Sequence, residues 1–134
     1  MSEDLIAAAL EARQRAYAPY SEFKVGAALR DETGRIHQGC NVENAAYPEG
    51  VCAEAAALAA MALSGARRCV EMAILAEGDL LLTPCGGCRQ KLREFGGDEM
   101  RILSCDGSGE VRRVFLLGEL LPFAFGPEQL RFVK

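Results

Sequence analysis

The apolar residues change their spacing along this chain, and the spacing predicts alternating helices and strands. Over residues 2–16 they recur every three to four positions, which is typical of a helix with one buried face. Residues 25–31 and 35–42 flank a short turn and predict a β-hairpin. Further strands are expected over residues 70–76, 101–105 and 111–117, a helix is expected over residues 85–95, and Pro122 and Pro127 are expected to break up the tail.

Residues 51–66 form a segment of strong helix formers that is apolar on every face except at Glu54. A helix that is apolar all round has to be covered on all sides. In a chain of 134 residues one side can pack on the sheet, whereas the other side needs a partner subunit. We therefore expect the chain to oligomerise.

The complete set of elements predicts a single α/β domain over residues 1–134, with five strands in one sheet and helices on both of its faces. Hydrophobic residues make up 50% of the chain and charged residues 25%, a balance typical of ordinary globular proteins. The formal net charge of −4 disfavours binding to nucleic acid, because phosphate backbones repel an acidic surface. The acidic start, Met1-Ser2-Glu3-Asp4, is unlike a signal peptide, and no apolar run is long enough for a membrane span. We expect a cytoplasmic protein.

The six cysteines call for an explanation other than disulfides, because cytoplasmic thiols stay reduced. Two short motifs contain three of them: Cys52-Ala53-Glu54 and Pro84-Cys85-Gly86-Gly87-Cys88. Each motif lies at the start of an expected helix, so two helix N-termini would converge on one metal and favour thiolates there. Three thiolates hold zinc and leave the fourth tetrahedral position open to water, within reach of Glu54.

Other interpretations of these cysteines are weaker. A lone CxxC motif can be a redox pair or part of a structural zinc site, but a structural site needs a fourth protein ligand. His37, the only histidine, lies in a strand where it is expected to face solvent. The remaining cysteines lie in strand-like runs and are expected in the core: Cys40, Cys69 and Cys105.

Cys-Ala-Glu followed by Pro-Cys-x-x-Cys is the pattern of the zinc-dependent nucleobase deaminases. The chain resembles one branch of them, the small-subunit cytidine deaminases, which are typically homotetramers. The resemblance extends over nearly the whole chain. The matching runs are Tyr17-Ala-Pro-Tyr-Ser21, Phe23-Lys-Val-Gly-Ala27, Gly39-Cys-Asn-Val-Glu-Asn-Ala-Ala-Tyr47, Pro84-Cys-Gly-Gly-Cys-Arg-Gln90 and Glu119-Leu-Leu-Pro-Phe-Ala-Phe-Gly126.

The resemblance implies a fold, a reaction and a cofactor. The fold would be the three-layer α/β/α cytidine-deaminase-like fold with a mixed five-stranded sheet. The reaction would be hydrolysis of cytidine and deoxycytidine to uridine and deoxyuridine plus ammonia, a step of pyrimidine salvage. One Zn²⁺ per chain would be held by Cys52, Cys85 and Cys88. Its hydroxide would attack C4 while Glu54 carries the proton to N3 and then to the departing ammonia.

The resemblance also implies substrate contacts. Asn41 and Glu43 match positions that bind the ribose 3′-hydroxyl, although on spacing alone they are a polar strand end. Phe23 matches an aromatic that packs on the pyrimidine, although a lone Phe at a strand start is usually core. The backbone of Ala53 and Thr83 would contact the base, and Phe125 with the backbone from Ala45 to Tyr47 would complete a neighbouring subunit's pocket.

One position departs from the family pattern. Many relatives have an arginine after Cys-Ala-Glu that donates to the zinc thiolates, and this chain has Ala55 there. Three thiolates and Zn²⁺ sum to −1, which weakens the metal as a Lewis acid unless other donors compensate. Arg89, or the N–H groups of the helix starts, is expected to take over this task. We expect an altered pH optimum, which an Ala55→Arg variant would shift.

This departure leaves alternatives open. Relatives that deaminate cytosine-bearing antibiotics also lack the arginine, but they differ around the sugar motif that contains Asn41 and Glu43. A modified cytidine is an alternative substrate. Larger relatives that act on deoxycytidylate or tRNA use histidine as first ligand, where this chain has Cys52. A zinc-stabilised binding module without catalysis has no need of Glu54.

Overall fold

Five strands form one sheet in the computed structural model, which describes residues 2–133. The strands are β1 (Gly26–Asp31), β2 (Ile36–Cys40), β3 (Cys69–Leu75), β4 (Arg101–Cys105) and β5 (Val111–Leu116). The helices are α1 (Ser2–Gln14), α2 (Ala53–Ser64), α3 (Gly86–Phe95) and α4 (Leu117–Leu120), with 3₁₀ turns η1 (Tyr47–Glu49) and η2 (Pro127–Val133). Among the described residues, none of the helices is both long and apolar enough to cross a bilayer.

The sheet is mixed, with the strand order β2-β1-β3-β4-β5. β1 pairs antiparallel with both β2 and β3, and β5 pairs antiparallel with β4. β3 and β4 are parallel, because α3 lies between them in the chain and returns it to the same edge before β4 begins. The predicted hairpin is therefore the β1–β2 pair at one edge of the sheet.

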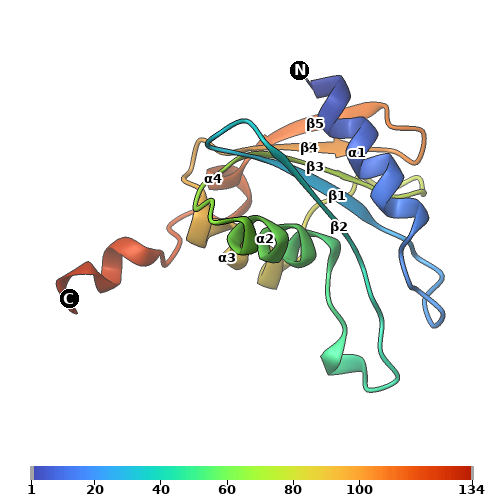
Figure 1. The fold of residues 1–134 in the computed structure, drawn as a ribbon, viewed down its shortest axis with the longest axis horizontal. Helices are drawn as coiled ribbons and strands as arrows, with labels where there is room; N and C mark the ends of the chain where they lie inside the picture. The colour runs from blue at the N-terminus through green and yellow to red at the C-terminus, as the bar shows by residue number, and fades with distance from the viewer. Residues whose placement is uncertain (1, 134) are drawn as a thin grey trace.

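Helices cover both faces of the sheet, which confirms the predicted three layers. α1 lies on one face, and α2 and α3 lie side by side on the other (Figure 1). The alternation of side chains along β3 divides the core accordingly. Met72 and Ile74 pack with α2 and α3, whereas Ala73 and Leu75 pack with α1.

Two glycines let the helices approach the sheet closely. A Cβ atom added at Gly26 would lie 2.1 Å from the Ala9 carbonyl oxygen of α1. A Cβ atom added at Gly39 would lie 2.3 Å from the Ala53 carbonyl oxygen and 2.4 Å from the Ala57 nitrogen of α2. All three distances are shorter than any real contact, so only glycine fits at either position. Gly39 thus determines how closely the start of α2 packs on β2.

α2 buries only part of its apolar surface in the single chain. Ala57 and Met61 face the sheet and are fully buried, whereas Leu63 on the other side is 90% exposed. Cys69 and Cys105 are buried as predicted, and Cys40 is half-buried. The side of α2 that turns away from the sheet remains open, as the sequence pattern predicted.

Several element boundaries differ from the prediction. β2 ends at Cys40 rather than at Val42, because Val42 leaves the sheet to form bridges with Tyr17 and Val51. α4 was not predicted; the Leu116 N–H donates to the Glu119 carboxylate at its start. Pro127 was expected to break the tail, but it begins η2, a place that proline tolerates because its missing N–H would be unpaired there anyway.

The prediction that His37 faces solvent was wrong. Its side chain is only 11% exposed, and its Nε2 atom lies 2.8 Å from Oδ2 of Asp31. Asp31 ends β1 with a fully buried side chain, so its oxygens need partners. Thr33 donates to it through both its N–H and its hydroxyl, and Arg35 through its N–H. His37 therefore belongs to the hairpin structure.

Candidate metal centre

Three cysteine sulfurs lie together where two helices begin. The Sγ atoms of Cys52, Cys85 and Cys88 are all within 4.8 Å of one another. Cys52 is the N-cap of α2, Cys85 is the N-cap of α3, and Cys88 lies in the first turn of α3. The structure thus confirms that the two motifs converge at paired helix starts.

The sulfur geometry fits a zinc ion. Zinc–thiolate bonds of about 2.3 Å in a tetrahedron place the sulfurs about 3.8 Å apart, so the cluster needs at most a small contraction. Within residues 2–133, the group of possible metal ligands at this place consists of these three cysteines. A tetrahedral ion held by three sulfurs keeps one position for another ligand.

The three thiols differ in how readily they ionise. The backbone N–H of Cys88 lowers the pKa of Cys85, which is the effect expected at a helix start. Burial raises the pKa of Cys52 and of Cys88, and the neighbouring negative groups add to the rise at both. The predicted preference for thiolates at the helix starts is therefore seen at Cys85 alone. At Cys52 and Cys88 a bound cation would be needed to favour the thiolate over the thiol.

Glu54 is a buried carboxylic acid beside the sulfurs. It lies in the first turn of α2 and is only 6% exposed. Burial raises its pKa, while its own backbone N–H and the Cys88 thiol act in the opposite direction. The influence of Cys88 indicates that the carboxyl group lies close to the cysteine cluster. A carboxyl group with a raised pKa can accept and return a proton near neutral pH.

Arg89 holds the loop that carries Cys85. Its guanidinium donates to the carbonyl oxygens of Pro84 at 2.7 Å and Leu120 at 2.8 Å, and to the Thr83 hydroxyl at 3.0 Å. These bonds connect the Thr83–Cys85 loop to α4. The hydrogen bonds that the structure gives to Arg89 therefore all reach oxygen atoms, and the expected donation to the thiolates is not among them.

A short ladder joins the expected sugar-binding residues to the metal centre. Val42 pairs with Val51, the residue directly before Cys52. On one side of Val42, the Asn41 amide donates to the Phe23 carbonyl at 2.8 Å and accepts from the Val25 N–H at 2.9 Å. The positions of the sugar motif and of Cys52 are thus determined by the same backbone.

Glu43 lies on the other side of Val42 and binds the loop after α1. Its carboxylate accepts from the N–H groups of Tyr20 at 2.9 Å and Ser21 at 3.1 Å, and from the Ser21 hydroxyl. The Ser21 hydroxyl is the main cause that lowers the pKa of Glu43, so this carboxyl group is ionised at neutral pH. It faces a cavity of about 390 Å³. The cavity is lined by Tyr20, Ser21, Glu43, Asn44, Tyr47 and Gly50.

Ser21 and Tyr20 had no predicted role, although both lie in the first matching run and donate to Glu43. Two other expected substrate contacts lie next to the cysteines. Ala53 is the first residue of α2, directly after Cys52, and Thr83 lies in the loop that leads to Cys85. Phe23 is 45% exposed.

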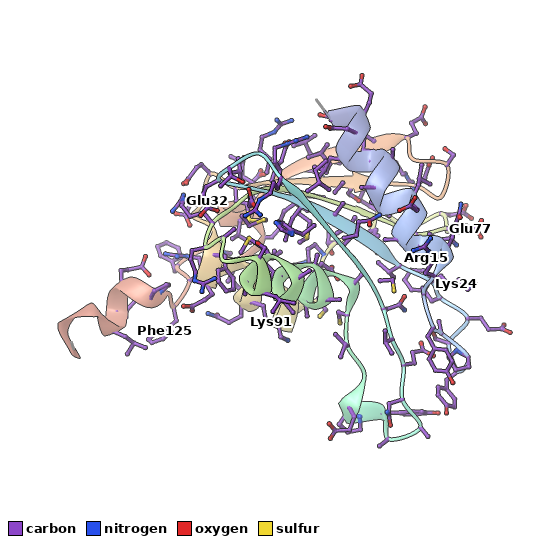
Figure 2. The ribbon with its side chains drawn as sticks, in the orientation of Figure 1. Arg15, Lys24, Glu32, Glu77, Lys91 and Phe125 are labelled. Atoms are coloured by element: carbon purple, nitrogen blue, oxygen red, sulfur yellow. The ribbon has the colours of Figure 1, made fainter. Side chains whose placement is uncertain are left out.

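The residues expected to complete a neighbouring pocket lie on the surface of the single chain. Tyr47 is 75% exposed, and its ring lies 5.8 Å from that of Tyr20. Ala45 is also exposed. Phe125 is 57% exposed at the base of the η2 segment, where its carbonyl accepts from the Gln90 amide at 2.8 Å (Figure 2). η2 itself extends away from the sheet (Figure 1).

Comparison with known proteins identifies the family. Residues 1–104 match the family described as the cytidine and deoxycytidylate deaminase zinc-binding region. A cytidine deaminase of Sporosarcina psychrophila is 40% identical over 130 residues, which cover 97% of this chain and 95% of the relative. One from Mycobacterium tuberculosis is 44% identical over 122 residues, which cover 91% and 87%.

A solved structure resembles the fold closely. The crystal structure of cytidine deaminase from Burkholderia pseudomallei superimposes with a TM-score of 0.87 at 43% identity, covering 93% of this chain and 99% of the other. Sequence, fold and the three-cysteine cluster thus agree. The chain belongs to the cytidine deaminase family.

Proposed function

We propose that this chain hydrolyses the 4-amino group of cytidine and deoxycytidine, giving uridine and deoxyuridine plus ammonia. The observation that supports this most strongly is the buried Glu54 carboxyl group beside three clustered cysteines. A metal site that only stabilised the fold would not need a buried acid next to it. The family resemblance supports the same reaction.

Cys52, Cys85 and Cys88 would hold one zinc ion per chain. When bound, zinc would activate water as a nucleophile at neutral pH. Glu54 would take the proton that this water loses, deliver it to N3 of the pyrimidine, and transfer the second proton to the leaving amino group. Burial of Glu54 suits this role, because it raises the pKa toward the working range.

Asn41 and Glu43 would bind the ribose 3′-hydroxyl, which cytidine and deoxycytidine share. The Asn41 amide has a second N–H to donate, and the ionised Glu43 carboxylate is a strong acceptor. Phe23 would pack on the pyrimidine. The Ala53 N–H and the Thr83 carbonyl would contact the O2 atom and the leaving amine.

The active form would be a homotetramer with shared sites, built from chains that each form one domain. The open side of α2 and the exposed Phe125, Ala45 and Tyr47 support an assembly in which neighbours complete each pocket. The enzyme would act on free nucleosides in cytoplasmic pyrimidine salvage, without nucleic-acid or membrane partners. A second candidate is a modified or antibiotic cytosine nucleoside, favoured by Ala55 beside Glu54.

Ultraviolet absorbance tests this proposal. Zinc-loaded protein is mixed with cytidine, deoxycytidine or cytidine monophosphate, with Glu54→Gln as the matched variant. We expect turnover of both nucleosides but not of the monophosphate, and a loss in Glu54→Gln of about 100- to 10,000-fold at unchanged zinc content. Turnover that survives in Glu54→Gln would refute the role of Glu54. If the zinc-loaded chain turns over none of the three, the modified-nucleoside candidate takes its place.

A further inference from the structure

Zinc binding would gather negative charge at the starts of α2 and α3. Three thiolates with Zn²⁺ sum to −1, and an ionised Glu54 adds another negative charge next to them. In a partly buried site such charges interact over several ångströms, so a nearby cation stabilises the centre. Arg89, the nearest arginine in sequence to these cysteines, directs its hydrogen bonds to oxygen atoms of the surrounding loops.

Lys91 lies one turn after Cys88 on α3, and its side chain extends back toward the start of that helix. A Cβ atom added at Gly87 would lie only 3.8 Å from the Lys91 Nζ atom. Gly87 is flanked by the metal-ligand positions, since Cys88 follows it directly and Cys85 precedes it by two residues. Side chains on a helix lean toward its N-terminus, and Lys91 is four residues after Gly87 on α3. Helix geometry therefore holds the ammonium group near the metal-ligand positions.

Lys91 also lines the groove of about 400 Å³ that runs between α2 and α3. Ala55, the residue after Glu54, lines the same groove, and its small side chain leaves that room open. Figure 2 shows Lys91 where the two helices lie side by side. Burial raises the pKa of Glu54, and the positive charge of Lys91 acts in the opposite direction, so the ammonium group lies within electrostatic reach of the carboxylate.

No salt bridge engages Lys91 within the part of the chain that the structure describes. Glu94, one turn further on, lines the same groove without forming an ion pair with it. The ammonium group is thus available to the cysteine–Glu54 cluster. We propose that Lys91 is an electrostatic partner of the metal centre and offsets the negative charge of its three thiolates from the groove that Ala55 leaves open.

This proposal rests on the proposed zinc site and predicts its affinity. Thiols release their protons when they bind zinc, so loading changes the charge of the three-cysteine group from zero to −1. A neighbouring cation therefore favours the loaded state over the empty one. The interaction is partly screened, because Lys91 is exposed, and exposed pairs correspond to about a two- to fivefold change in an equilibrium constant.

Competition with a chromophoric chelator tests the proposal at neutral pH, in low and in high salt. Lys91→Met keeps the length of the side chain and removes its charge, whereas Lys91→Arg keeps the charge. Lys24→Met is the matched control, because Lys24 is an exposed lysine beyond the end of α1, away from α2 and α3 (Figure 2). The melting temperature of the metal-free proteins shows whether a variant has lost packing.

We expect Lys91→Met to weaken zinc binding about two- to fivefold in low salt and less in high salt. Lys91→Arg and Lys24→Met should bind zinc like the unmodified chain. Adding Ala55→Arg to Lys91→Met should restore affinity, because the new guanidinium enters the same groove. Unchanged affinity in Lys91→Met, an equal loss in Lys24→Met, or a loss that salt does not reduce would each overturn the proposal. If the unmodified chain binds no zinc, the proposed zinc site itself is refuted, and with it the proposed function.

Discussion

Gly39 offers a test of how the fold positions the metal centre. In Gly39→Ala the new Cβ atom would lie 2.3 Å from the Ala53 carbonyl oxygen and 2.4 Å from the Ala57 nitrogen, whereas ordinary contacts begin near 3.4 Å. The first two turns of α2 must therefore move outward by about 1 Å. Overpacking of this kind costs about 1–3 kcal/mol. In a chain of 134 residues that corresponds to a fall in melting temperature of about 4–10 °C.

The same shift moves Cys52, the N-cap of α2, relative to Cys85 and Cys88 on α3. Zinc affinity should fall together with stability, so both are measured: the melting temperature of the metal-free chain, and zinc binding by chelator competition. Gly86→Ala is the control, because a Cβ atom there meets nothing within 4 Å although the residue adjoins Cys85. If Gly39→Ala keeps both the melting temperature and the zinc affinity, α2 does not approach β2 as closely as described.

Two further predictions concern buried and hydrogen-bonded carboxylates. Burial of Asp31 tends to raise its pKa, but hydrogen bonds from Thr33, His37 and Arg35 outweigh it and hold the pKa below the ordinary 3.8. Its stabilisation is thus complete at neutral pH and lost as the pH falls below that value. Asp31→Asn should melt lower at pH 7 and show a shallower loss of stability on acidification in thermal melts; an equally steep loss would contradict this. Glu43→Gln should raise the KM for cytidine about tenfold or more, because a hydrogen bond to a charged group is lost. The KM for 2′,3′-dideoxycytidine, which has no 3′-hydroxyl, should stay nearly unchanged. Equal effects on the two KM values would contradict the proposed contact between Glu43 and the 3′-hydroxyl.

The sequence pattern predicted the elements that bury a periodic apolar face. The hairpin, β3 to β5 and the three long helices all appear within a few residues of their expected bounds. α4 was missed because it is four residues long and depends on a local bond from the Leu116 N–H to Glu119. His37 was misplaced because alternation along a strand does not reveal a buried partner such as Asp31, which ends the adjacent strand.

The candidate site was predictable to the extent that its residues form local motifs. The clustering of Cys52, Cys85 and Cys88 could be predicted from the sequence, because each motif begins a helix. The bonds of Arg89 to Pro84 and Leu120 could not be predicted, because they depend on how α4 packs against the Cys85 loop. The proximity of Lys91 to Gly87 follows from their spacing on the predicted helix, but the groove that Lys91 shares with Ala55 became visible only in three dimensions.

Titration of the metal-free chain with zinc tests whether cytidine turnover depends on one zinc ion held by the three cysteines. After complete removal of metal by a chelator, cytidine turnover is measured as zinc is added in small steps. We expect no turnover at the start, a linear rise, and a break at one zinc per chain, with no rise in Cys88→Ser. Metal-free protein that turns over cytidine as fast as the zinc-loaded form would contradict this dependence.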